Sequence, residues 1–223
     1  MLDKSKTDPV LGQKIHSVLV EAGVETPLNP DGVPTNTNPK QVIQESVRNI
    51  LRVLGLDLTD DSLVETPSRI AKMYVNELYW GLDYDNFPKT TVIENKMHYE
   101  NMLIERHISV KSTCEHHLLP FLGEAYIAYL PDQKIIGLSK LNRVVEFFSR
   151  RPQVQERLTE QIYYTLAELL ETESVAVVIQ AQHSCVRVRG VEDVNSDTVT
   201  SRLGGAFLER PALRDEFYQA IRL

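Results

Sequence analysis

The spacing of apolar residues predicts a helix near the start of the chain, followed by an irregular linker. In residues 10–22 apolar side chains recur at intervals of three and four, the period of an amphipathic helix, and Gly23 ends it. These side chains are Ile15, Val18, Leu19 and Ala22. Residues 25–40 hold four prolines, three asparagines and a glycine, a composition typical of a linker without a repeating element.

Two further helices are predicted after the linker. One covers residues 39–54 and is stopped by Gly55; the other begins with Thr66 as N-cap and Pro67 as first helical residue. Arg69 and Lys72 are three apart on this second helix and so share a face, which by default is a solvated surface. We expect a boundary near residue 40, with an N-terminal helical arm and linker over 1–40 and the main body over 41–223.

From residue 90 onward the pattern changes to that of strands. Residues 102–110 alternate imperfectly, and residues 123–130 form a second run rich in β-formers. The first run places Ile104, Ile108 and Val110 on one face, with Arg106 interrupting. The stretch KSTCEHHLLPF (residues 111–121) is predicted to be a connection between the two strands, with Pro120 and Gly123 as breakers.

Two helices with clear apolar rows follow. Ser139 opens the first, and Lys140 and Arg143 share an edge beside its apolar stripe. Pro152 is predicted to start the second, in which Glu156 lies about 200° around the helix from the buried row and is by default a solvated glutamate. The buried positions are Leu141, Val144, Val145 and Phe148 in the first helix and Val154, Leu158, Ile162 and Leu166 in the second.

A long strand is predicted over residues 174–189, and a closing helix over 211–222. The strand alternates at Val175, Val177, Ile179 and Ala181. Continuing this period of two puts His183, Cys185, Arg187 and Arg189 on the same face, which is unusual for a core and suits the floor of a pocket. The order strand, strand, helix, helix, strand, strand predicts an α+β fold, an antiparallel sheet with two helices on one face.

Composition narrows the class of protein. Hydrophobic residues at 42% and charged residues at 25% are ordinary for a soluble globular chain, and 223 residues suffice for one sizeable domain with an appended segment. The start has no leader pattern, and no run approaches the roughly 18 apolar residues of a membrane span, so we expect a cytoplasmic protein without a membrane partner. A net charge of −7 argues against a nucleic-acid partner but not against a small anionic ligand.

The candidate chemistry lies in two short segments. Cys114, Glu115, His116 and His117 are consecutive, and His183 and Cys185 repeat the pairing of thiol and imidazole about seventy residues later. Cys114, His117 and Cys185 form a Cys₂His set that suits zinc with a fourth position left to water. His116 and His183 are then free to move protons. The alternatives are a surface loop beside a buried thiol and two cysteines that serve as core thiols.

Several blocks of the sequence resemble the GTP cyclohydrolase I family, over roughly residues 42–223. They are TPSRIAKMY, CEHHLLPFLGEAYIAYLP, IIGLSKLNRVVEFFSRRPQVQERLTEQI, QHSCVRVRG and SDTVTSRLGGAF. The resemblance implies conversion of GTP and water to formate and 7,8-dihydroneopterin triphosphate, the first committed step toward folate and related pterins. It also implies that Cys114, His117 and Cys185 bind zinc, which activates water for attack at guanine C8.

The resemblance implies roles for the other positions too. His183 would protonate the guanine ring, and His116 and Ser139 would assist later proton transfers. Glu156, with Gln155 beside it, would accept hydrogen bonds from guanine N1 and the 2-amino group, a donor pair that adenine lacks. The triphosphate would be held by four cations, Lys140, Arg143, Arg189 and Arg69. Glu115 is left a structural role.

The fold implied by the resemblance is the tunnelling fold, in which sheets join edge to edge into rings. Two pentamers would form a decamer of identical chains, with active sites between subunits. Two rivals remain: a tunnelling-fold reductase that uses a cysteine as nucleophile, and a non-catalytic ring protein stabilised by zinc. A zinc nucleobase deaminase is disfavoured because its H-x-E and P-C-x-x-C arrangement is absent.

Overall fold

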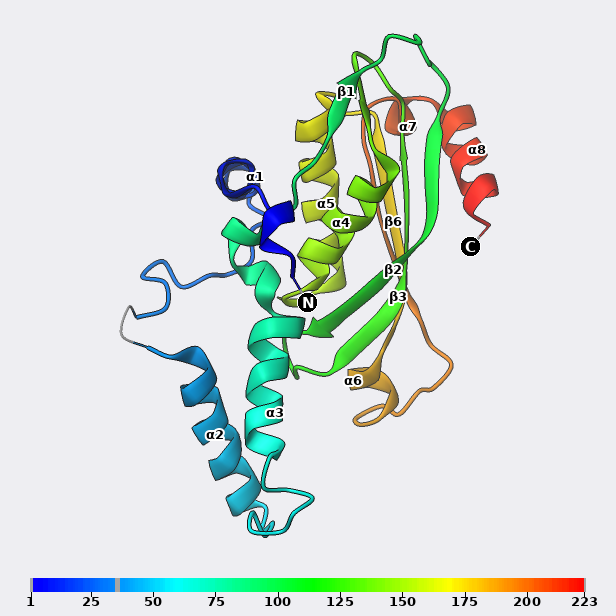
Figure 1. Cartoon of the computed structure of the whole chain (residues 1–223). Helices are drawn as coiled ribbons and strands as arrows, with labels where there is room; N and C mark the ends of the chain where they lie inside the picture. The colour runs from blue at the N-terminus through cyan, green and yellow to red at the C-terminus, as the bar shows by residue number, and fades with distance from the viewer. Residues whose placement is uncertain (1, 35–36, 223) are drawn as a thin grey trace.

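The computed structural model describes residues 2–34 and 37–222, and these form an α+β protein around one five-stranded sheet (Figure 1). The sheet order is β5-β2-β3-β6-β7, and a small separate ladder pairs β1 with β4. The strands are β1 (Val92–Glu94), β2 (Leu103–Cys114), β3 (Pro120–Tyr129), β4 (Lys134–Ile136), β5 (Pro152–Gln153), β6 (Val175–His183) and β7 (Thr198–Leu203). All neighbours in the large sheet are antiparallel except β5, which runs parallel to the end of β2.

Helices cover both faces of the sheet, but unequally. On one face, α4 and α5 bury the predicted apolar rows in the main core, except for Val154, which precedes α5 as its N-cap and is only partly buried. On the other face, α7 and α8 cover one end of the sheet (Figure 1). The helices are α1 (Pro9–Glu21), α2 (Pro39–Val53), α3 (Thr66–Met73), α4 (Leu138–Ser149), α5 (Gln155–Leu170), α6 (Ser184–Arg187), α7 (Ala206–Glu209) and α8 (Pro211–Ile221). The two predicted helices, α4 and α5, therefore do lie on one face of the sheet. The prediction that only this face is covered is wrong, because α7 and α8 pack on the opposite face.

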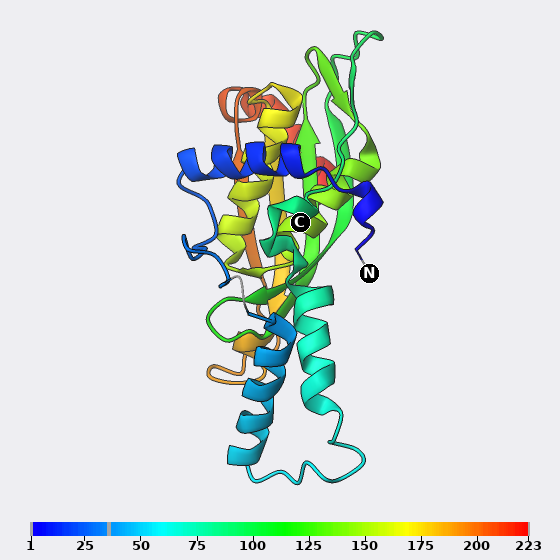
Figure 2. The same ribbon diagram turned by 60° about the vertical axis from the view of Figure 1, so that its left-hand side comes forward.

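The N-terminal arm packs onto the main body. Helix α1 crosses α5 (Figure 2), and its Ile15 and Leu19 are fully buried in the main core. Asp8 caps α1 by accepting from the Leu11 amide at 3.0 Å, as an N-cap residue does. Residues 35 and 36 of the predicted linker lie outside the described residues. The first two residues of that linker, Glu25 and Thr26, contact the main body at Arg151.

Helices α2 and α3 form a hairpin that projects from one end of the body (Figures 1 and 2). The prediction for α2 is confirmed, with Asn38 as N-cap and Gly55 just past the end at φ 81°. For α3 the prediction is one residue out, because Glu65 is the N-cap and Thr66 is already helical. A short π-helix, Tyr74–Leu78, continues α3 toward the sheet.

A β-bulge in β2 changes which residues face the core. The register shifts between Glu105, opposite Ile127, and Ile108, opposite Ala125, so two residues of β2 face one of β3. Ile108 and Val110 are buried in the main core, whereas Ile104 packs on the second core. The predicted common face of Ile104 and Ile108 is therefore wrong, since the extra residue inverts the alternation.

Candidate metal centre and active site

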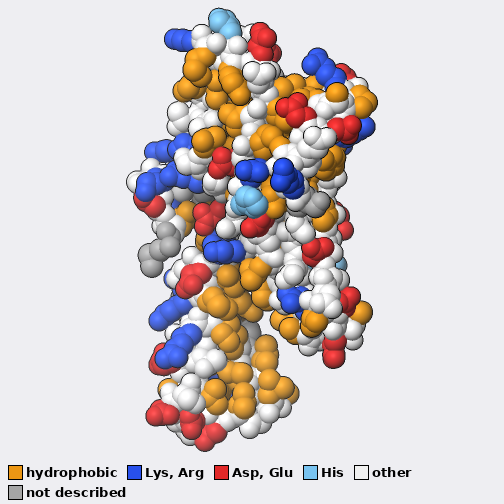
Figure 3. All heavy atoms as spheres, turned by 90° about the vertical axis from the view of Figure 1, so that its right-hand side faces the viewer, with side chains coloured by type: hydrophobic (Ala, Val, Ile, Leu, Met, Phe, Trp, Pro, Cys, Tyr) orange, Lys and Arg blue, Asp and Glu red, His pale blue; other side chains and the backbone are white. Residues whose placement is uncertain are grey.

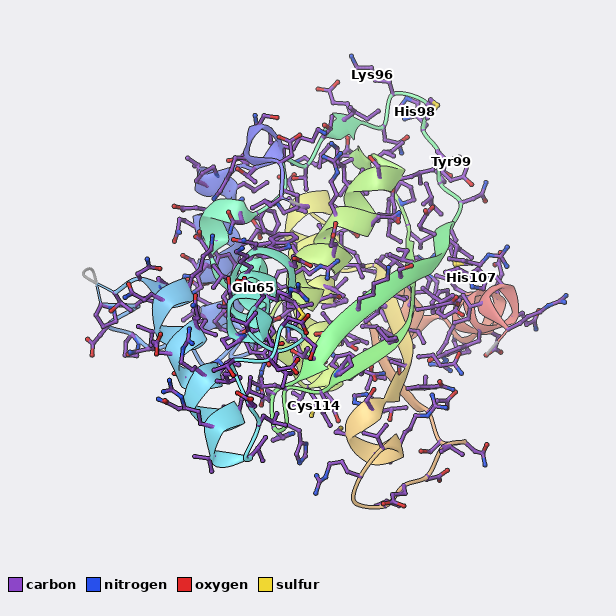
Figure 4. All side chains as sticks on the ribbon, turned by 60° about the horizontal axis from the view of Figure 1, so that its bottom comes forward. Glu65, Lys96, His98, Tyr99, His107 and Cys114 are labelled. Carbon is purple, nitrogen blue, oxygen red and sulfur yellow. The ribbon has the colours of Figure 1, made fainter. Side chains whose placement is uncertain are left out.

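The first half of the site is a strand end. Cys114 is the last residue of β2 rather than part of the loop, and Figure 4 shows it where the strand reaches the edge of the body. Its amide donates to the Leu119 carbonyl at 2.8 Å, and the Leu118 amide donates to the Cys114 carbonyl at 2.8 Å. These two bonds close a tight turn that holds Glu115, His116 and His117 beside the cysteine.

The second half of the site follows β6. The strand ends at His183, and Ser184–Arg187 form the short helix α6, so the predicted strand over 174–189 is wrong beyond residue 183. Cys185 therefore does not reach the site by strand alternation. The helical turn instead brings its thiol back against the end of β2.

Cys114, His117 and Cys185 come together as the sequence predicts. One ligand atom from each of the three lies within 4.8 Å of the others, and both cysteines are free thiols. Sγ of Cys114 is 4.0 Å from Nδ1 of His117. A tetrahedral zinc with usual bond lengths needs ligand atoms about 3.5–3.8 Å apart, so small side-chain movements would complete the set.

The electrostatics of the two thiols favour a cation. Burial, together with the neighbouring Cys114, raises the pKa of the Cys185 thiol. Two thiolates this close repel each other unless a positive charge lies between them. The donor set and its charge therefore fit a divalent soft or borderline metal such as zinc.

The ring of His117 is held by an arginine from the segment after α6. Nη1 of Arg189 donates to Nε2 of His117 at 2.7 Å. In this arrangement the neutral ring carries its proton on Nδ1, the nitrogen nearer Cys114 Sγ. If Nδ1 bound a metal, the ring proton would move to Nε2, which could then no longer accept from Arg189. The guanidinium of Arg189, which is exposed, would be left to bind another acceptor.

His116 lies outside the three-residue group although it is close to one member. Its Nδ1 is 3.6 Å from Cys114 Sγ, and the ring is exposed. The distance to Cys114 alone would rank His116 above His117 as a ligand. Only His117, however, joins both thiols in the three-residue group, so the predicted role of His116 in proton transfer stays a prediction.

His183 is fixed by contacts on two sides. Its ring stacks on Phe121 with centroids 4.5 Å apart, and its Nε2 lies 2.8 Å from Oε1 of Gln155. Burial lowers the pKa of His183, a shift that nearby Glu156 partly opposes. The neutral ring with a free Nδ1 is therefore favoured, because Nε2 must donate to the amide oxygen.

Gln155 owes its orientation to the sheet, which sequence reasoning missed. Its side chain is 1% exposed, and Nε2 approaches the carbonyls of Ile179 and Thr198 at 3.0 and 2.9 Å and Oγ1 of Thr200 at 3.1 Å. These acceptors take the amide protons, so the oxygen must face His183. The structure thus gives Gln155 an internal contact with His183, whereas its predicted contact with substrate stays a prediction.

Glu115 connects the turn to α5. Its carboxylate accepts from both terminal nitrogens of Arg157, at 2.5 and 3.3 Å. This ion pair lowers the pKa of Glu115. Such a bidentate contact suits the structural role expected of Glu115.

The remaining predicted site residues lie on several different elements. Glu156 is exposed in the first turn of α5, near enough to His183 to influence its pKa. Ser139 and Lys140 lie in the first turn of α4, which begins at Leu138 rather than at the predicted Ser139. The far end of α4, about 16 Å along the axis, leads to β5 beside Cys114. Arg143 lines a separate cavity of about 690 Å³, and Arg69 is exposed on α3.

Together these features describe an α+β protein with a three-residue candidate metal centre at one end of its sheet. The sequence profile of the family described as GTP cyclohydrolase I matches residues 43–222. A protein of Shewanella amazonensis named GTP cyclohydrolase 1 is 56% identical over 205 residues, 92% of this chain and 94% of its own length. Proteins of the same name from Vibrio parahaemolyticus and Vibrio cholerae are each 54% identical over 208 residues, 93% of this chain and 95% of their own. The chain belongs to the GTP cyclohydrolase I family.

Proposed function

We propose that this protein is a zinc-dependent GTP cyclohydrolase I, which converts GTP and water to formate and 7,8-dihydroneopterin triphosphate for folate or pterin synthesis. The observation that carries the proposal is the convergence of Cys114, His117 and Cys185, from two distant segments, beside the oriented ring of His183. Membership of the family identifies GTP as the substrate. When bound, zinc would supply a Lewis acid that activates water near neutral pH.

The residues around the metal group would divide the remaining work. The free Nδ1 of His183 can carry a proton to the guanine ring, because Nε2 is engaged by Gln155. His116, exposed beside Cys114, can exchange protons with solvent during the later steps. Ser139 stays assigned to those steps as a prediction.

The direct test is incubation of the purified protein with GTP, with formate and oxidised pterin fluorescence measured alongside zinc per chain. Formate release together with about one zinc per chain supports the proposal. Formate release without zinc would remove the metal assignment. Zinc without turnover would favour the non-catalytic ring protein, and reduction of a nitrile substrate without tightly bound zinc would favour the cysteine-nucleophile reductase.

Glu156 is proposed to select guanine. Its exposed carboxylate can accept from N1 and the 2-amino group, and it makes no hydrogen bond within the described residues that would compete. Glu156→Gln should raise the KM for GTP about 10- to 100-fold, the worth of a hydrogen bond to a charged group, with a smaller effect on kcat. Steady-state kinetics measure this. Glu168→Gln on the same helix, which loses only an ion pair with Lys14, should behave as wild type; an unchanged KM in Glu156→Gln would return Glu156 to a solvated surface.

The triphosphate-binding cations point to sites shared between subunits. Arg189 lies beside His117, whereas Lys140 and Arg143 belong to α4 and Arg69 to α3, so the four cations come from three separate parts of the chain. A neighbouring copy can supply the missing members. We therefore propose the tunnelling fold, with chains joined edge to edge in a ring and active sites between them.

The sheet offers the edges that such a ring needs. Among the described residues, β5 pairs with only Thr113 and Cys114, so the rest of β2 has a free edge, and β7 has another. Open edges favour strand addition by another chain. A cavity of about 350 Å³ runs between this part of β2 and α4, and its lining includes Ser109, Lys111 and Asn142.

The α2–α3 hairpin suits contact between two rings. Figure 3 shows apolar side chains along the projecting end of the molecule. Val47 is the one residue of α2 that is buried, while Val42, Ile50, Val53 and Leu54 are 54%, 58%, 88% and 69% exposed. An apolar face of this kind marks an interaction site. We therefore propose a decamer of two pentamers. We also propose that the arm and linker over 1–40 dock on a catalytic domain over 41–223 and that the protein is cytoplasmic. Among the described residues, no helix has the length and apolar character of a membrane span.

The hairpin proposal predicts a change in assembly. Wild-type protein should sediment as ten chains, and the double variant Ile50→Glu, Val53→Glu should halve this mass, because charges cannot be buried unpaired at an interface. Sedimentation velocity measures both. Gln41→Glu, an exposed polar change on the same helix, should leave the mass unchanged. A double variant that keeps the wild-type mass would place the contact between rings elsewhere.

A further inference from the structure

A buried polar cluster joins the N-terminal arm to the strand that supports Cys114. We call it the arm anchor; its members are Glu25, Thr26, Arg151, Gln153 and Gln161. Arg151 has no exposed surface, and its guanidinium carbon lies 5.1, 4.8 and 5.0 Å from the ring centroids of Tyr84, Phe147 and Phe148. A charge so far from water requires partners.

The arm supplies those partners. Nη1 of Arg151 lies 3.5 Å from the Glu25 carboxylate and 3.2 Å from Oγ1 of Thr26. Tyr84 also donates its hydroxyl to Glu25, and Nη2 of Arg151 donates to the Gly81 carbonyl. A buried guanidinium that lost the arm would be left without its carboxylate, so the arm is a structural part of the body.

A second chain of hydrogen bonds runs parallel to the first. Nε2 of Gln161 donates to the Val24 carbonyl at 3.0 Å and to Oγ1 of Thr26 at 3.2 Å. Oε1 of Gln161 accepts from Nε2 of Gln153 at 2.7 Å. Thr26 Oγ1 therefore accepts from both Arg151 and Gln161, and is the point where the two chains meet.

Both chains end on residues that flank Cys114. The Arg151 carbonyl accepts from the Ser112 hydroxyl at 3.1 Å, and the Gln153 carbonyl accepts from the Glu115 amide at 3.0 Å. Gln153 is also the β5 partner of Cys114. The residues on each side of this cysteine, Ser112 through its hydroxyl and Glu115 through its amide, are thus bound by residues that the arm holds, whereas Cys185 is held by β6 and α6.

We propose that Glu25 and Thr26 are positioning residues for the metal centre: through Arg151, Gln161 and Gln153 they hold the Cys114–His117 half of the zinc site at the spacing that Cys185 requires. The inference rests on the proposed zinc function and assigns the arm a role in it. Weakening the arm anchor should therefore speed zinc release at a point where the free energy of unfolding is still close to that of wild type.

The test variant is Thr26→Val, which keeps the shape of the side chain and removes the shared acceptor, while Arg151 keeps Glu25 and Gln161 keeps the Val24 carbonyl. Zinc transfer to a chromogenic chelator should be about tenfold faster than in wild type, the lower end of the range for residues that orient metal ligands. The matched control is Tyr163→Phe, which loses a comparable bond to the Glu173 carbonyl at 3.2 Å, remote from β5. Tyr163→Phe should release zinc at the wild-type rate, although its unfolding midpoint should be similar to that of Thr26→Val.

Further readouts separate positioning from general destabilisation. Cobalt-substituted Thr26→Val should show weaker thiolate charge-transfer absorption, excess zinc should restore its formate release, and Glu25→Gln should shift zinc release in the same direction. Equal release rates in folded Thr26→Val and wild type would overturn the inference, as would equal acceleration in Tyr163→Phe. Failure of the proposed metal assignment would look different, because wild-type protein itself would then hold no zinc, and the inference would fall with it. Failure of the proposed catalysis alone would show as wild-type protein that holds zinc and releases no formate, and the zinc-release comparison would still stand.

Discussion

Cys185→Ala is expected to give a folded protein that holds no stoichiometric zinc and releases no formate from GTP. Cys185 is only half-buried and lies in the short helix α6, outside the fully buried core, so removing its sulfur should cost little stability. It is, however, one of three candidate ligands. Losing a ligand should weaken zinc binding beyond the roughly 100-fold upper end seen for outer-shell partners.

Metal analysis after dialysis, circular dichroism and the formate assay together measure this result. Ser184→Ala is the matched control, since it changes the preceding residue of the same helical turn and should keep zinc and turnover. Cys185→Ser should resemble Cys185→Ala, because a hydroxyl does not replace a thiolate on zinc. Full zinc content and activity in Cys185→Ala would remove the metal hypothesis for this site.

The elements that the sequence predicted well are those whose burial repeats locally. Leu141, Val144, Val145 and Phe148 of α4 are all fully buried, as their spacing requires. In α5, Leu158, Ile162 and Leu166 are fully buried too, and Glu156 is exposed. A repeat of 3.6 residues reports which face meets the core, whatever the core consists of.

Two errors have a common cause, namely pairing with a distant strand. Nothing near Arg106 and His107 signals the bulge in β2, which depends on the register with β3. Pro152, a plausible first residue of a helix, instead enters β5 and pairs with Thr113. Helix α5 consequently begins at Gln155, after Val154 as N-cap.

The candidate site was predictable in its residue types but not in its supports. Two rare cysteines beside histidines indicate a metal group wherever the chain places them. The hydrogen bond from His183 to Gln155 joins residues 28 apart, and the arm anchor joins residues more than 120 apart. Such contacts exist only after folding has brought distant segments together, so a single glutamine or arginine in the sequence does not predict them.

His183→Ala is expected to keep zinc and to block the reaction before formate appears. The imidazole is outside the three-residue metal group, and its free Nδ1 is the atom proposed to carry a proton to the guanine ring. Removing a general acid or base lowers a rate by about 100- to 10,000-fold, so formate release should fall by that factor while zinc per chain stays at the wild-type value. Zinc analysis and single-turnover formate measurement check the two halves of this prediction.

The control for His183→Ala is His98→Asn, which changes an exposed histidine in the loop far from the sheet end (Figure 4) and tolerates the positive φ of 51° at that position. It should match wild type in zinc and in formate. Loss of zinc from His183→Ala would mean that this ring supports the metal group itself. Wild-type formate release followed by failure to form the pterin would instead move His183 to a later proton transfer, because opening of the guanine ring would then not depend on it.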